Sequence, residues 1–261
     1  MFHFDITKIL NNFSLIFLFI LPIAYIFSPP LINLSVLVII VNFIYALIIA
    51  KNKSLFSDKL FIFLFIFWLY ISIQSLFLEN ANFFKSFTFV RFIFLPFAIC
   101  YLLKVNYDKI SKLNLFYFII LALVIMDLFF QYLTGIDILG YRVELINGYD
   151  ASSDNWRDLQ IQRFSGPFGY EIRAGTFILF FGIICISLYS NFYKKKNFFL
   201  QSFSFFILIV SVIITGDRAP LVTLFITFLM YILFSKFQLK YYLSIFVTSI
   251  LLFSLFLSFS K

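Results

Sequence analysis

The sequence has few of the residues that metal centres, disulfide frameworks and acid–base catalysis require. Among 261 residues there are two cysteines and one histidine, and only 12% of the residues are charged. His3 lies near the N-terminus, while Cys100 and Cys185 fall inside apolar runs. This scarcity excludes a His–Cys metal cluster, a histidine-based catalytic triad and a disulfide scaffold, and no Walker phosphate-binding loop is present. We therefore expect no metal centre.

Apolar residues dominate instead. The chain is 63% hydrophobic with 43 phenylalanines, whereas soluble domains average about 45–50% apolar residues. Long apolar runs with few charges are typical of transmembrane helices, so we predict an all-α, polytopic transmembrane helix bundle that forms a single integral membrane domain over residues 1–261. The predicted spans, about nine in number, are 13–27, 31–50, 60–77, 87–103, 113–133, 175–189, 199–215, 220–234 and 241–258.

Lysine and arginine are sorted between alternate loops. The net charge of +8 is a topology signal in such a chain, so no nucleic-acid partner is expected. One side carries lysine and no arginine, at positions 8, 51, 53, 59, 104, 109, 112, 194, 195, 196, 236 and 240. The other side carries Lys85, Lys261 and all the arginines, at positions 91, 142, 157, 163, 173 and 218.

Short lysine-rich loops lie in the cytoplasm. The N-terminus is therefore predicted inside, and the large loop over residues 134–174 outside. Arginine differs from lysine in its planar fork of donors, which suits phosphate and carboxylate. Outer arginines therefore suggest anion recognition. The alternative is that they form structural ion pairs with the carboxylates of the loop.

Two ionisable residues lie inside predicted spans at similar depth, near the outer edge of the membrane. They are Arg91 and Asp127. Because a charge within a span is costly without a partner, we expect the two to pair. The pair would either belong to a functional site or lock two helices together.

Three arginines fall at the outward-facing starts of predicted spans, namely Arg91, Arg173 and Arg218. A helix N-terminus carries positive partial charge and free N–H groups, so cations gathered there favour a bound anion. Asp217 either caps the helix that follows it or pairs with Arg218.

The stretch from Arg163 to Gly175 leads from the outer loop into the sixth span. Its glycines and Pro167 force a turn and allow a ligand to approach the backbone closely. Glu171 and Arg173 follow the turn. They are either part of a binding site or an internal pair in a rigid corner.

Four pieces of the sequence, in this order, resemble the O-antigen ligase and polymerase family. They are 86–92 (SFTFVRF), 127–140 (DLFFQYLTGIDILG), 163–175 (RFSGPFGYEIRAG) and 215–219 (TGDRA). The third is similar to the family pattern Arg-x-Ser-Gly-x-Phe-x-x-Glu, and the fourth to Thr-Gly-Glu-Arg.

The resemblance implies transfer of a glycan carried on undecaprenyl diphosphate, outside the bacterial cytoplasmic membrane, by a bundle of the C-class glycosyltransferase kind without metal or other cofactor. It implies that Arg163 and Arg218 grip the diphosphate, and Glu171 is a carboxylate available as a base or to orient arginines. On the positional argument, Arg91, Arg173, Asp127 and Asp217 are added as substrate-binding candidates. The partners would be the lipid-linked oligosaccharide and membrane lipid.

The acceptor would be a second lipid-linked glycan in a polymerase and lipid A–core in a ligase. Ligases of the family use a histidine in a second large outer loop, and this sequence stops at Lys261, about where that loop would begin. We therefore expect a C-terminally truncated chain. The alternative functions are export of a lipid-linked glycan or polysaccharide, which predicts charges near the bilayer midplane, and a non-catalytic membrane scaffold.

Overall fold

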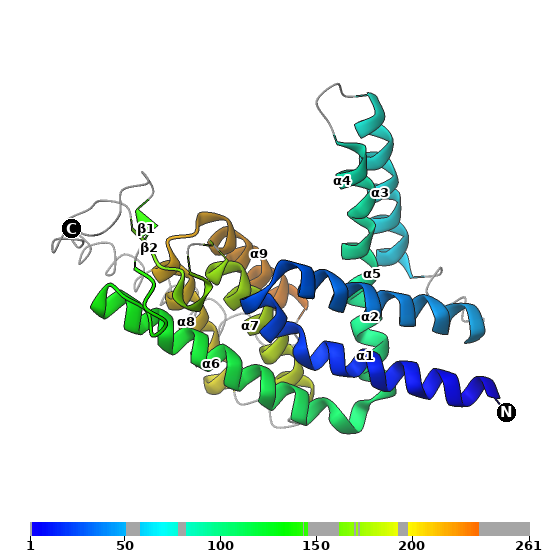
Figure 1. Ribbon diagram of the computed structural model, residues 1–261, viewed down its shortest axis with the longest axis horizontal. Coiled ribbons are helices and arrows are strands. Elements are labelled where there is room, and N and C mark those ends of the chain that lie inside the picture. The colour runs from blue at the N-terminus through cyan, green and yellow to red at the C-terminus, as the bar shows by residue number, and fades with distance from the viewer. Residues whose placement is uncertain are drawn as a thin grey trace. The chain divides into compact units, whose positions relative to one another are not determined.

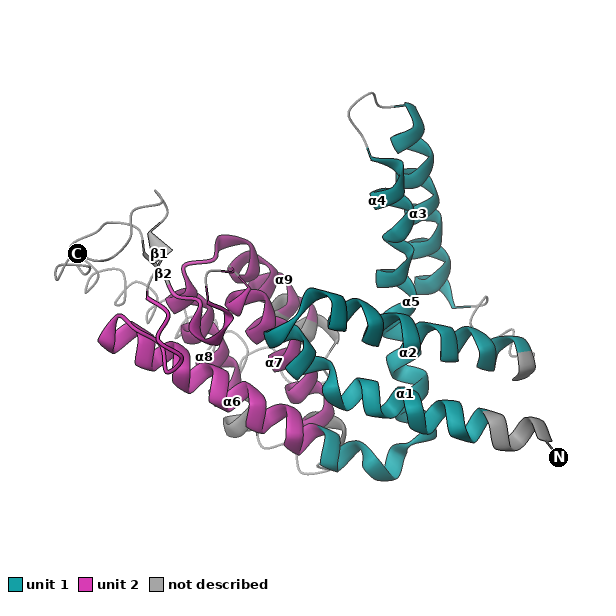
Figure 2. Ribbon diagram, viewed as in Figure 1, with its two compact units in different colours: residues 1–113 teal, residues 114–261 magenta. Residues whose placement is uncertain are grey.

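The computed structural model describes residues 2–50, 58–77, 82–142, 144–145, 162–169, 171, 173–192 and 198–234. Over these residues the chain is almost entirely helical (Figure 1). The predicted ninth span, Arg157 and the middle of the large loop lie outside them. The chain divides into two compact units, Met1–Leu113 and Asn114–Lys261 (Figure 2), and the single membrane domain stays a prediction beside this division.

Five helical segments are long and apolar enough to cross a membrane, as expected of an integral membrane protein. They are Thr7–Phe27, Pro29–Ile48, Lys59–Phe77, Phe83–Val105 and Tyr107–Thr134, and they coincide with the first five predicted spans. Three shorter apolar helices, Ala174–Tyr189, Phe203–Thr215 and Arg218–Thr227, coincide with the next three. The full count of nine stays a prediction.

The first unit is built from α1 (Phe2–Phe27), α2 (Pro29–Ala50), α3 (Lys59–Phe77), α4 (Phe83–Thr88) and α5 (Val90–Val105). Helices α1 and α2 pack side by side, α2 packs on α5, and α3 packs on α4 and α5 (Figure 1). Pro29 suits the first position of α2, where the helix needs no N–H group. Between the first two helices, the Asn42 amide donates to Oδ1 of Asn11 at 3.0 Å, and both residues are buried.

The fourth predicted span is interrupted, contrary to the single helix expected from residue 87. Helix α4 ends at Thr88, and α5 begins at Val90, so Arg91 lies at the very start of α5 rather than a full turn inside a longer helix. Asn82 caps α4 by accepting from Lys85 N. Nε1 of Trp68 donates to the carbonyl of Phe87 at 3.1 Å, which gives a carbonyl beside the interruption a donor from α3.

The second unit follows a 3₁₀ turn, η2 (Tyr107–Lys109), and contains most of α6 (Ile110–Thr134). The short strands β1 (Glu144–Leu145) and β2 (Gln162–Arg163) pair antiparallel, with Glu144 opposite Arg163. A 3₁₀ turn, η4 (Gly166–Phe168), precedes α7 (Ala174–Phe192), α8 (Phe198–Thr215) and α9 (Arg218–Phe234).

Helix α7 lies at the centre of this unit and packs on both α8 and α9. The approach of α7 and α8 is close because Gly182 has no side chain: a Cβ there would lie 2.5 Å from a methyl carbon of Leu208. Fully buried apolar side chains fill the interior, including those of Leu128, Phe177, Phe181, Val212 and Leu224.

Candidate functional site

Three of the four motif segments meet in the second unit: the end of α6 with the turn after it (127–140), the corner segment (163–175) and the Thr215 segment (215–219). The backbone N–H of Phe164 donates to the carbonyl of Thr215 at 3.4 Å. The N–H of Gly166 donates to Oε1 of Gln131 at 2.8 Å. The corner segment is therefore hydrogen-bonded to both of the others.

The end of α6 holds the turn that opens the large loop. Oδ1 of buried Asp127 accepts the N–H of Ile138 at 2.8 Å. Nε2 of Gln131 donates to the carbonyl of Tyr141 at 3.3 Å. Within the turn, Asp137 accepts the N–H of Tyr141 and a bridge joins Ile136 to Arg142. The last turns of the helix thus fix the direction of the loop by polar contacts.

The corner segment depends on two glycines with positive φ. Gly166 has φ 53° and Gly169 has φ 63°, backbone conformations that favour glycine. The Ser165 hydroxyl donates to the carbonyl of Gly169 and closes the turn. A Cβ at Gly169 would lie 3.3 Å from the ring of Tyr141, so the corner also packs tightly on the turn after α6.

Gly175 brings the start of α7 against the start of α9. A Cβ at Gly175 would lie 2.8 Å from Oδ2 of Asp217 and 2.9 Å from Oγ1 of Thr215. The N–H of Asp217 donates to Oγ1 of Thr215 at 3.4 Å. Two helix N-termini, each with free N–H groups and positive partial charge, therefore lie next to each other.

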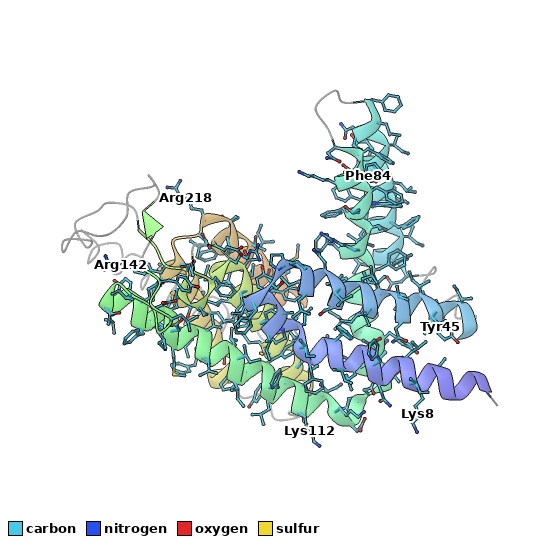
Figure 3. The ribbon with its side chains drawn as sticks, in the orientation of Figure 1. Lys8, Tyr45, Phe84, Lys112, Arg142 and Arg218 are labelled. Atoms are coloured by element: carbon cyan, nitrogen blue, oxygen red, sulfur yellow. The ribbon has the colours of Figure 1, made fainter. Side chains whose placement is uncertain are left out.

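An arginine lies at the start of each of these two helices. Arg173 immediately precedes α7, and its Nε lies 2.7 Å from Oε2 of Glu171. Arg218, labelled in Figure 3, is the first residue of α9 and is exposed. It forms no ion pair with any carboxylate among the described residues. Arg173 is thus partly neutralised, while the charge of Arg218 is available to an anion.

Besides Asp127, a second buried carboxylate belongs to Asp137, which lies in the turn after α6. Only 3% of Asp137 is exposed, and its Oδ2 has no hydrogen-bond partner among the described residues. Burial raises the pKa of this carboxyl above its ordinary value, and the nearby carboxylate of Asp127 raises that pKa further. The backbone N–H of Tyr141 acts in the opposite direction.

The remaining arginine candidates from the sequence are Arg163 and Arg91. The backbone of Arg163 pairs with Glu144, and its side chain lies outside the described residues. Arg91 lies in the first unit, where Nη1 donates to Oδ1 of Asn33 at 2.8 Å and the guanidinium lies 4.9 Å from the ring centroid of Phe92. The expected Arg91–Asp127 pair would join the two units and stays a prediction.

Sequence reasoning did not identify two of these partners. Asn33 lies one turn into α2, and its position near the outer end of a predicted span was the available signal. Gln131 belongs to the motif stretch 127–140, and nothing in the sequence predicts its contacts with the two ends of the loop. Its spacing of four residues from Asp127 puts both on one face of α6, and this was the signal for a shared role.

Among the described residues, no three His, Cys, Asp or Glu side chains lie close enough together to hold a metal ion. No protein-family model matches the chain, and neither a curated protein nor a solved structure matches it.

Proposed function

We propose that this protein transfers a glycan from undecaprenyl diphosphate during assembly of a bacterial surface polysaccharide, as a polymerase or ligase of the O-antigen type. The reaction would take place at the outer face of the cytoplasmic membrane. The protein would be an enzyme of glycosyl transfer that works without metal, and a single structural observation supports this function.

That observation is the contact of Gly175 with Thr215 and Asp217. It joins the corner segment to the Thr215 segment, the two pieces most similar to the motifs of the family. The segments are separated by forty residues of chain, so their contact is a property of the fold and not of sequence proximity. Arg173 and Arg218 are carried by the two helix starts that meet there.

The chemistry suits a lipid diphosphate as leaving group. Negative charge grows on the diphosphate as its bond to the sugar breaks, and preorganised donors aimed at that charge stabilise the transition state. Arg218 would supply such donors at the start of α9. Arg163 would supply them at the start of the corner segment. The charge of Arg173 and the N–H groups at the starts of α7 and α9 would add to the positive electrostatic potential at the diphosphate.

Glu171 contributes less directly in this scheme. Its carboxylate lies 2.7 Å from Nε of Arg173, a geometry that orients the arginine. Asp217 lies against Gly175 and positions the start of α9. We propose both as orienting groups, with Asp127 holding the turn after α6 and Arg91 as a separate contact for the lipid-linked substrate.

The proposed orientation puts the N-terminus in the cytoplasm and the loop 134–174 outside. Two contacts within the first unit agree with the sorting of lysine and arginine to opposite ends of the helices, on which this orientation rests. Nζ of Lys109, a predicted inner lysine, donates to Oδ1 of Asn12 in the N-terminal half of α1 at 3.2 Å. Arg91, a predicted outer arginine, contacts Asn33 near the start of α2. Lys8 and Lys112, labelled in Figure 3, belong to the inner set of lysines.

The proposal is tested by arginine-to-lysine exchange, which keeps the charge and removes the forked donors. Arg163→Lys and Arg218→Lys should abolish polymer or ligated glycan in a host that lacks the native gene. Arg142→Lys, in the exposed turn after α6, is the matched control and should retain it. Each variant is compared at equal amounts of protein in the membrane. Full activity of both Arg163→Lys and Arg218→Lys would refute the diphosphate clamp.

A further inference from the structure

Gln131 forms hydrogen bonds to both ends of the large outer loop. Its amide is fully buried, with 0% of the residue exposed. Oε1 accepts the N–H of Gly166 at 2.8 Å, and Nε2 donates to the carbonyl of Tyr141 at 3.3 Å. Tyr141 belongs to the turn through which the chain enters the loop, and Gly166 to the corner through which it returns.

Packing around Gln131 reinforces this double contact. Asp127, one turn earlier on the same face of α6, accepts the N–H of Ile138. The backbone of Leu128 approaches Gly166 so closely that an added Cβ would lie 3.6 Å from its nitrogen. The entry turn is thus held by two side chains of α6, whereas the exit is held to α6 by the Gln131 amide and close packing.

The chemistry of the site requires an uncharged amide. One atom must accept a backbone N–H and another must donate to a backbone carbonyl, and a primary amide offers both on one planar group. A buried backbone group that loses its partner is costly. Neither an apolar side chain nor a carboxylate satisfies both groups at once.

We propose that Gln131 is a positioning residue. Its amide acts as a clip, because it holds the exit of the outer loop to the entry by hydrogen bonds. The clip thereby fixes the position of the corner segment, with Arg163 and Arg173, relative to the end of α6. The assignment of an active role to that corner rests on the proposed function. The clip itself is a structural claim that can be tested without any substrate.

The first test measures the distance between the entry turn and the start of α7. Spin labels are placed at the exposed positions of Leu139→Cys and Thr176→Cys, with Cys100 and Cys185 changed to alanine, in the full chain in lipid nanodiscs. With Gln131 present, pulsed electron paramagnetic resonance should give one narrow distance distribution. Gln131→Met, which keeps the length and removes both hydrogen bonds, should broaden or shift it.

Gln74→Met is the matched control, since Gln74 is an exposed glutamine near the end of α3. It should leave the distribution unchanged. A distribution in Gln131→Met as narrow as that of the parent, and at the same distance, would overturn the proposal.

A second measurement needs no variant. Hydrogen exchange resolved to single amides should show the Gly166 N–H of the unmodified protein to be protected, although it lies in a turn. Exchange at the rate of a free amide would overturn the clip, whether or not Gln131→Met folds.

The activity of Gln131→Met distinguishes a positioning role of Gln131 from a purely stabilising one. Gln131→Met should lower the kcat of glycan transfer by up to about 100-fold, the cost of misplacing reacting groups by about 1 Å, at an unchanged amount of protein in the membrane. A lower amount of protein with unchanged kcat would refute the positioning role. If the label distance changes as expected while Arg163→Lys and Arg218→Lys stay active, the clip stands and the proposed function falls.

Discussion

Gly175 and Asp217 approach each other so closely that one added carbon at Gly175 would lie 2.8 Å from Oδ2 of the aspartate. The backbone of Gly175 does not need glycine for its φ angle, since it is not among the residues with positive φ. Glycine is required because there is no room for a side chain. The close approach holds the start of α7 against the start of α9, and with them Arg173 and Arg218.

The first prediction follows from this lack of space. Gly175→Ala should displace Asp217 and Thr215, lower the free energy of unfolding by about 1–3 kcal/mol and strongly reduce glycan transfer. Gly182→Ala is the matched control on the same helix, where the added carbon meets the end of the Leu208 side chain instead. It should cost stability but leave activity per folded molecule intact.

The measurements are thermal unfolding of the purified protein and polymer formation per amount of folded protein. Equal activity of the two alanine variants would separate the Gly175–Asp217 contact from function. Loss of activity in Gly175→Ala alone would support it.

Much of the helical layout could be predicted because long apolar runs have few alternatives in a membrane. The spans at 60–77 and 113–133 agree with α3 and α6 to within a few residues, and the predicted loop 134–174 falls between the end of α6 at Thr134 and the start of α7 at Ala174. The interruption at Phe89 was not predicted. Residues 83–95 around it are phenylalanine-rich and contain no proline or glycine, and Pro96 follows only in the second turn of α5, so composition gives no sign of a break at Phe89.

The candidate site could be predicted as a list of residues but not as a set of contacts. The motif segments supplied Arg173, Arg218 and Asp217, and their order along the chain says nothing of which ones meet. The Gly175–Asp217 approach depends on how α7 and α9 pack, and packing is set by many small contacts spread over the interior. Helix periodicity does place Asp127 and Gln131 on one face, but not what they bind.

The second prediction concerns the pair of buried asparagines in the first unit. Asn42→Leu and Asn11→Leu should each weaken the packing of α1 on α2, because each leaves the other amide without the bond at 3.0 Å. Interhelical hydrogen bonds in membranes contribute about 0.6 kcal/mol on average and up to about 1.7 kcal/mol. A double-mutant cycle, measured by unfolding in mixed detergent micelles, should give a coupling in this range. A coupling of zero would show that the bond adds nothing to stability.

The third prediction concerns the indole of Trp68. Trp68→Phe keeps an aromatic ring between α3 and α4 and removes the donor to the Phe87 carbonyl. It should lower the free energy of unfolding by about 0.5–1.5 kcal/mol and increase hydrogen exchange at the start of α5. Tyr70→Phe, which removes an exposed hydroxyl from the same helix, should change neither quantity. Identical exchange in both variants would contradict a role for Trp68 at the interruption.

The fourth prediction is a dependence of stability on pH that arises from Asp137. Burial raises the pKa of this carboxyl in the folded protein, so the folded chain keeps a proton that the unfolded chain has released. The free energy of unfolding should therefore fall as pH rises from the ordinary value of about 3.9 through the raised pKa. The stabilising contribution is complete below that window and lost above it. Asp137→Asn cannot ionise, and its unfolding free energy should fall less between about pH 4 and about pH 7, as followed by thermal unfolding in detergent. Parallel curves for the two proteins would show that Asp137 ionises as easily in the fold as outside it.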